Sequence, residues 1–133
     1  MSEGNLFARF AVESNRINSK RIHRKLFEPR KDLTLSVETI DDLSCAPIIE
    51  AGKRVAKGMK KEKLYGWAKI TRPTIEELSL NVEVDNHPHE GHATIHGWPK
   101  ERDASILIQQ KLATLSYRIL LPKPIASTFS LSS

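Results

Sequence analysis

The chain contains one cysteine, Cys45, few aromatic residues and no long apolar run. A single thiol cannot form an internal disulfide, so the sequence is typical of a protein from a reducing compartment. No segment approaches the ~20 consecutive apolar residues that a membrane-spanning helix needs. The N-terminus also lacks the charged and apolar regions of a secretory signal. These absences predict a cytoplasmic protein that has no membrane partner.

The remaining composition is typical of one soluble domain. Of the 133 residues, 39% are hydrophobic and 28% are charged, a balance that allows a hydrophobic core without favouring disorder. We expect a single domain over residues 6–121. It is preceded by a flexible N-terminus (1–5) and followed by a Ser/Thr-rich tail (122–133) that is flexible or docked on a partner.

The positive charge is concentrated in two stretches, residues 16–31 and 53–63, and each of them contains only one acidic residue. The net charge is +5. A concentrated positive field favours a phosphate backbone as its partner. The alternative is that the basic residues only keep a small protein soluble. The residues predicted to bind nucleic acid are Arg16, Lys20, Arg21, Arg24, Lys25, Arg30, Lys31, Lys53, Arg54, Lys57, Lys60, Lys61 and Lys63.

Hydrophobic periodicity predicts short strands alternating with two helices. Alternating or continuous apolar residues indicate strands, whereas an apolar stripe at helical spacing indicates a helix. Ser44 is a suitable N-cap residue for the first helix. The predicted fold class is α+β, with a small, mostly antiparallel sheet of about five strands and two helices. The strands are expected near residues 6–12, 33–37, 64–70, 78–84 and 92–96, and the helices near 44–56 and 100–117.

Four of the five histidines lie between residues 87 and 96. Alternation along the predicted strand 92–96 places His92 and His96 on one face and Ala93 and Ile95 on the other. With the carboxylates of Asp85 and Glu90, these imidazoles form a donor set that suits a metal ion. Histidines near surface loops are more often simply polar residues. We therefore predict neither a metal nor another cofactor.

A metal-independent ribonuclease or phosphoesterase is the alternative function for this segment. Cleavage of RNA by its own 2′-hydroxyl needs a general base, a general acid and a cation. His92 and His96 are the predicted acid–base pair, and His23, within the first basic stretch, is a further catalytic candidate. Tyr65 and Trp98 are predicted to stack on bases. For Trp98 the Gly-Trp-Pro turn favours the alternative, in which the indole covers an edge of the core.

Three segments resemble a group of short, uncharacterised bacterial proteins. These proteins share an L-S-V strand, an L-Y-G strand and an H-A-x-I-x-G-W-P turn followed by a helix, which correspond here to residues 35–37, 64–66 and 92–99. The resemblance covers most of residues 10–115 and brings no activity with it. By analogy it implies a component of a bacterial defence or conflict system. It implies that His92, Gly97, Trp98 and Pro99 belong to the shared pattern, and that His87, His89 and His96 are particular to this sequence.

The main functional prediction is a basic accessory or binding module for nucleic acid or for a larger protein partner. The first alternative is the nuclease centred on His92. The second is a structural subunit that docks through its C-terminal tail, because the apolar segment Ile119–Ile125 has no obvious place in the predicted core.

Overall fold

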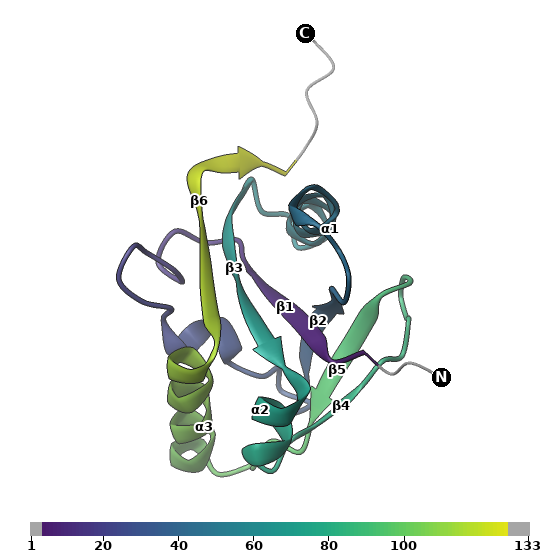
Figure 1. The fold of residues 1–133 in the computed structure, drawn as a ribbon. Helices are drawn as coiled ribbons and strands as arrows, with labels where there is room; N and C mark the ends of the chain where they lie inside the picture. Colours follow the sequence, from purple (N-terminus) through teal and green to yellow (C-terminus); the bar gives the residue numbers. More distant parts are fainter. Residues whose placement is uncertain (1–3, 128–133) are drawn as a thin grey trace, which may run out of the picture.

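Six segments of the chain pair into one antiparallel sheet, in the order β4-β5-β2-β1-β3-β6 (Figure 1). The computed structural model describes residues 4–127. The α+β class is confirmed, with one strand more than predicted and with the expected hairpin of β4 and β5. The strands are β1 (Leu6–Ala11), β2 (Leu35–Thr39), β3 (Lys63–Thr71), β4 (Asn81–Glu83), β5 (His92–His96) and β6 (Tyr117–Ala126).

The helices divide the core into two parts, one on each face of the sheet. Helix α1 (Cys45–Gly58) packs on the face that carries Phe10 and Trp67. Helix α3 (Arg102–Leu115) and the 3-10 turn η1 (Arg24–Phe27) pack with the other face, which carries Phe7. The short α2 (Arg72–Glu77) connects β3 to β4 and is capped by Thr71. Figure 1 shows α1 and α3 well separated from each other.

Arg9 occupies an irregular part of the sheet centre. Within residues 4–127 the β1–β2 ladder pairs Phe7 with Thr39 and Ala8 with Glu38 and goes no further. At the next residue, the guanidinium of Arg9 donates to the carbonyls of Ser36 (2.9 Å) and Leu26 (2.8 Å). Burial, with smaller contributions from Arg30 and Arg16, lowers the pKa of Arg9 to about 10. The side chain is therefore a cation in the sheet centre at neutral pH.

The C-terminal boundary predicted at residue 121 is wrong, because residues 122–126 continue strand β6. This strand pairs with β3, with Leu64 opposite Ile125, and Ile119 and Leu121 pack against the core under α1. Pro122 and Pro124 are tolerated because β6 is an edge strand, where an N–H can be missing without breaking a ladder. The segment Ile119–Ile125 thus has a place in its own fold. The rest of the expected tail, residues 128–133, lies outside the described residues.

The N-terminal segment is also more firmly held than predicted. The backbone N–H of Asn5 donates to the carboxylate of Asp41 at 2.9–3.0 Å, and Arg72 donates to the carbonyl of Gly4 at 2.8 Å. Residues 4 and 5 are therefore fixed to the sheet. Residues 1–3 of the expected flexible segment lie outside the described residues.

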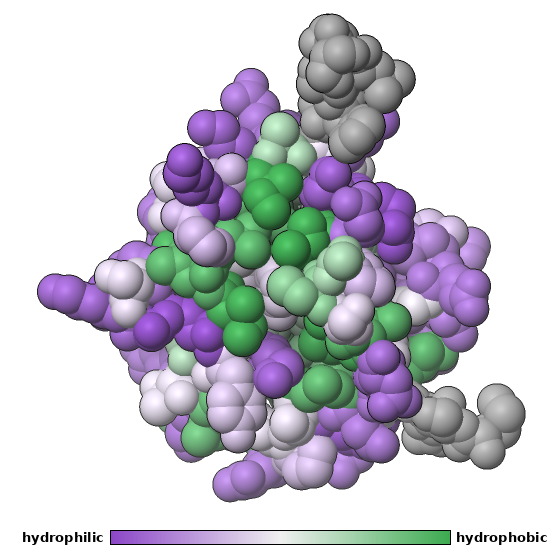
Figure 2. Space-filling view, turned by 45° about the horizontal axis from the view of Figure 1, so that its top comes forward, coloured by the Kyte–Doolittle hydropathy of each residue, from purple (hydrophilic) through white to green (hydrophobic). Residues whose placement is uncertain are grey.

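The surface mixes a small apolar area with a polar surround. Figure 2 shows apolar residues gathered in the middle of one face and ringed by hydrophilic ones. No helix in residues 4–127 is long and apolar enough to cross a membrane. Docking of a larger protein partner on this surface stays a prediction.

Candidate functional site

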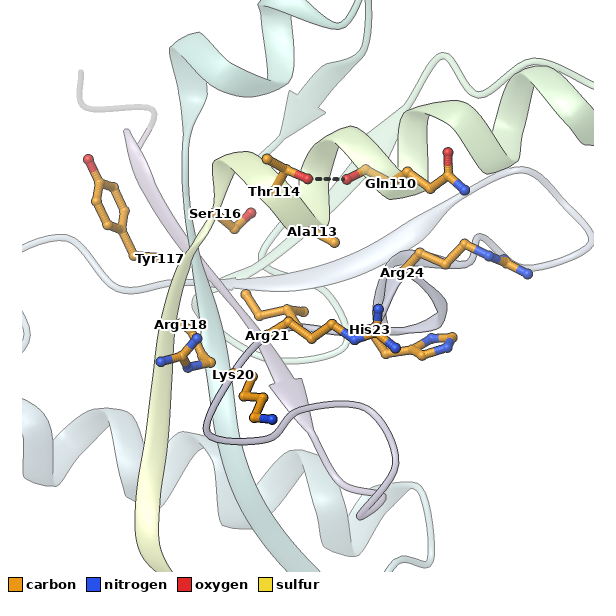
Figure 3. Close-up of a pocket in the computed structure, with 11 residues that line it drawn as sticks. Lys20, Arg21, His23, Arg24, Gln110, Ala113, Thr114, Ser116, Tyr117 and Arg118 are labelled. Carbon is orange, nitrogen blue, oxygen red and sulfur yellow. Dashed lines mark hydrogen bonds between the residues drawn. The ribbon is translucent and has the colours of Figure 1, made fainter.

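A basic hollow lies where loop 20–24 meets the end of α3 and the start of β6 (Figure 3). Its volume is about 660 Å³, and no acidic residue lines it. In Figure 3, Lys20, Arg21 and Arg118 lie on one side of this space, and Arg24 extends away along α3. The side chains that define the basic hollow are Lys20, Arg21, His23, Arg24 and Arg118, with Gln110, Thr114 and Ser116 of the α3 end as polar neighbours.

The cations of the basic hollow have no carboxylate partners in the described part of the chain. Arg24 donates to the neutral side chain of Gln109 at 2.8 Å, which orients its guanidinium without cancelling its charge. Several uncompensated cations around one space produce a local positive potential that attracts anions. Guanidinium groups also match phosphate oxygens with paired donors.

His23 also lines the basic hollow, but as a neutral hydrogen-bond donor and not as a cation. Its Nδ1 accepts from the backbone N–H of Lys25 at 3.1 Å and so caps η1. Burial and the neighbouring charges of Arg21 and Arg24 lower the pKa of His23. With Nδ1 accepting, the single proton of the neutral ring lies on Nε2. The residue therefore offers an N–H group to a ligand of the hollow, and its predicted catalytic role stays a prediction.

We expect the imidazole of His23 to titrate below its ordinary pKa of 6.5. NMR of the ring protons as a function of pH measures this midpoint. Because the folded chain binds this proton less readily than the unfolded chain, His23 favours the native state above pH 6.5 and loses that contribution as the pH falls through the lowered pKa. Replacing Arg21 by glutamine should move the midpoint part of the way back. A midpoint above 6.5 would contradict the described environment.

A second candidate site, the histidine cleft, lies on the α1 side of the sheet and has a volume of about 410 Å³. Strands β1, β2 and β5, the end of α1 and the loop before β5 meet there. The chemically active side chains that line the histidine cleft are Glu38, His89, His92, Arg9, Arg30 and Arg54.

Two histidine–carboxylate pairs lie at this cleft. His92, 9% exposed, places Nδ1 2.7 Å from Asp85, and Thr94 donates to the other oxygen of Asp85 at 2.6 Å. His89 places Nε2 2.9 Å from both oxygens of Glu38. The two imidazole rings lie edge to face with centroids 5.6 Å apart. Both carboxylates are therefore occupied by histidines.

The environment of Asp85 keeps it ionised. Burial alone would raise its pKa, but the hydrogen bonds from His92 and Thr94 outweigh burial and leave the pKa below its ordinary value. The carboxylate accordingly holds His92 with its Nδ1–H toward Asp85. In the described residues, Nε2 of His92 has no protein hydrogen-bond partner.

The loop before β5 brings these groups together through turn residues that were evident in the sequence. Asn86 and Gly91 adopt positive φ angles of 52° and 93°, a conformation that asparagine and glycine tolerate best. The Asn86 side chain accepts from the N–H of Gly91 at 2.8 Å, and its backbone N–H donates to the carbonyl of His92. The closed loop therefore returns His89 over the face that carries His92.

The structure separates the predicted catalytic histidines. His96 shares a face with His92, as alternation predicts, but its Nε2 lies 3.3 Å from Glu83 of β4 and the side chain does not line the cleft. His23 lies in the basic hollow. The second histidine beside His92 is instead His89, which the resemblance implied to be particular to this sequence.

The predicted nucleic-acid-binding residues also divide into groups. Lys20, Arg21 and Arg24 line the basic hollow, whereas Arg30 and Arg54 line the histidine cleft. Arg16 and Lys61 form ion pairs with Glu13, and Lys53 forms one with Glu50. The remaining predicted cations are exposed and line neither site; they are Lys25, Lys31, Lys57, Lys60 and Lys63.

The two residues predicted to stack on bases, Trp98 and Tyr65, do not present a free aromatic ring to solvent. Trp98 is 4% exposed and donates from Nε1 to the carbonyl of Ile95 at 3.2 Å, so its indole is part of the core and the stacking prediction for it is wrong. Tyr65 is half-buried and packs against the core on the α3 side. Neither residue lines the basic hollow or the histidine cleft.

Three residues that belong to the two sites were not predicted from the sequence. Arg9 interrupts an otherwise apolar strand, which was a signal for a special position. Glu38 lies opposite His92 in the β2–β5 register and is 5% exposed; only that register shows why an acidic residue is buried there. Arg118 is the second residue of β6, and no pattern in the sequence connects it to loop 20–24.

Comparison with protein-family models, with curated proteins and with solved structures finds no match. The resemblance to short bacterial proteins therefore stays a prediction. Within residues 4–127, no three His, Cys, Asp or Glu side chains are arranged so that they could hold a metal ion.

Proposed function

We propose that the protein is a binding module for single-stranded nucleic acid, which it holds at the basic hollow. The observation that carries this proposal is the set of cations around one space, Lys20, Arg21, Arg24 and Arg118, with no acidic residue in its lining. Such an arrangement is unfavourable without an anion, because like charges repel across it. A phosphate backbone supplies the anions at regular spacing.

Contacts to phosphates, rather than to bases, are expected to dominate binding. Arg21 and Arg118 offer guanidinium groups, and neutral His23 adds one donor. The ring of Tyr117, 62% exposed, points away from these cations in Figure 3 and lies near Lys69. Because phosphate contacts carry little sequence information, we expect weak sequence preference.

Fluorescence anisotropy with a labelled single-stranded RNA tests this proposal. Replacing Arg21 and Arg118 together by glutamine should lower the affinity, because two phosphate contacts are lost. It should also flatten the dependence of log Kd on log salt by about 0.7 for each lost contact. The matched control replaces Lys57 and Lys63 by glutamine, which removes the same charge from outside both sites.

Two results would contradict the proposal. One is an affinity that does not respond to salt. The other is an equal loss in the hollow variant and the control, which would show a general effect of net charge.

The setting of this activity is part of the proposal. The thiol of Cys45 is exposed and unpaired, which suits a reducing compartment and supports the predicted cytoplasmic location. A role in bacterial defence rests only on the resemblance of residues 35–37, 64–66 and 92–99 to the short bacterial proteins. Docking through the C-terminal segment was predicted because Ile119–Ile125 had no obvious place in the core. This reason no longer holds, because β6 places the segment in the sheet.

A further inference from the structure

We infer that the histidine cleft cleaves RNA by acid–base catalysis, with the 2′-hydroxyl of the substrate as the nucleophile. This activity goes beyond binding at the basic hollow and uses different residues. The inference rests on three features that the cleft brings together: a carboxylate-oriented His92, a second histidine in ring contact with it, and arginines without carboxylate partners.

His92 is arranged as the general base. Asp85 holds its Nδ1 at 2.7 Å, and Thr94 fixes the second oxygen of Asp85 at 2.6 Å. With the proton on Nδ1, the lone pair of the neutral ring is on Nε2, which has no protein partner among the described residues. Because a carboxylate stabilises the imidazolium that forms when Nε2 takes a proton, the pair is suited to accept one.

His89 is arranged as the general acid. It is the side chain that donates to the carboxylate of Glu38, at 2.9 Å to each oxygen. Glu38 is buried, and a buried carboxylate needs a donor or a cation beside it. In its imidazolium form, His89 satisfies Glu38 through Nε2–H and keeps Nδ1–H to give away. The ring contact with His92 places both histidines within reach of one phosphodiester.

Three arginines supply the charge that the transition state needs. Among residues 4–127, the guanidinium of Arg9 donates only to backbone carbonyls, and the one side-chain hydrogen bond of Arg30 goes to the hydroxyl of Ser36, at 3.4 Å. Arg54 lines the same cleft from α1 and has no carboxylate partner in residues 4–127. Cations fixed in a partly desolvated site stabilise the extra negative charge that develops on phosphorus oxygens.

The reaction balances without a further reagent. Nε2 of His92 removes the proton of the 2′-hydroxyl, and the 2′-oxygen forms a bond to phosphorus. The bond from phosphorus to the 5′-oxygen breaks, and His89 transfers its proton to that oxygen. The products are a 2′,3′-cyclic phosphate and a 5′-hydroxyl end, and the two histidines have exchanged protonation states.

The test is cleavage of a labelled single-stranded RNA by the full chain in the presence of EDTA. We expect fragments that end in a 2′,3′-cyclic phosphate and no cleavage of the same sequence made of deoxynucleotides. Replacing His92 by asparagine should lower the rate by about 10²–10⁴-fold. Replacing His96 by asparagine is the matched control, because His96 lies on the same strand and face but outside the cleft.

A second variant keeps the test decisive if the His92 substitution disturbs folding. His89 lies on the exposed loop before β5, so His89→Asn should fold and still lower the cleavage rate, because the proton donor to the 5′-oxygen is lost. Cleavage that persists in both variants, or that also occurs on DNA, would overturn the inference. Absence of cleavage by the wild-type chain while the basic hollow binds RNA would overturn it too and would leave the proposed function standing.

Discussion

Replacing Trp98 by alanine is expected to lower the free energy of unfolding by about 3–5 kcal/mol, the usual cost of truncating a buried aromatic residue. Trp98 is 4% exposed and packs in the core on the α3 side of the sheet. The substitution also removes the donor for the carbonyl of Ile95. Urea denaturation followed by circular dichroism measures the change.

Trp98→Phe is a milder substitution at the same position. It keeps an aromatic ring in the core but removes the N–H and the five-membered ring of the indole, so the expected loss is smaller than for alanine, about 1–3 kcal/mol. Under conditions where both variants are folded, their affinity for RNA should equal that of the wild type. A variant with unchanged stability and a tenfold weaker affinity would instead return Trp98 to its predicted stacking role.

Replacing Gly66 by alanine is expected to destabilise the chain by about 1–3 kcal/mol through overpacking. A Cβ at Gly66 would lie 2.2 Å from the carbonyl oxygen of Ile119 and 3.1 Å from Cα of Leu120. Both are backbone atoms of β6, so relief requires the edge strand to move away from β3. Hydrogen exchange should show faster exchange of the β6 amides, and thermal denaturation should show a lower Tm.

Gly58→Ala is the matched control for this prediction. A Cβ at Gly58 meets nothing within 4 Å, and alanine is the better helix former by about 1 kcal/mol. The control should therefore equal or exceed the wild type in stability. If Gly66→Ala is as stable as Gly58→Ala, the close pairing of β3 with β6 is contradicted, together with the position of Arg118 at the rim of the basic hollow.

Several elements could be predicted because their signals are local. Ser44 precedes α1 at the N-cap position, although its side chain makes no capping hydrogen bond among residues 4–127, and Pro47 lies in the first turn, where a missing N–H costs little. Alternation correctly placed Ala93 and Ile95 in the core. Strand β6 was missed because Pro122 and Pro124 argue against a strand, and only an edge position, which is a property of the whole sheet, permits them.

Composition and short-range periodicity were therefore sufficient for the α+β class, for most of the elements and for the concentration of histidines and cations. Which residues come together in each of the two sites depended on the tertiary structure. The sheet order β4-β5-β2-β1-β3-β6 places Glu38 beside the loop that carries His89, and the start of β6 brings Arg118 to loop 20–24. These contacts join residues far apart in the chain. Which of them meet depends on the order of the strands in the sheet, which local patterns do not encode.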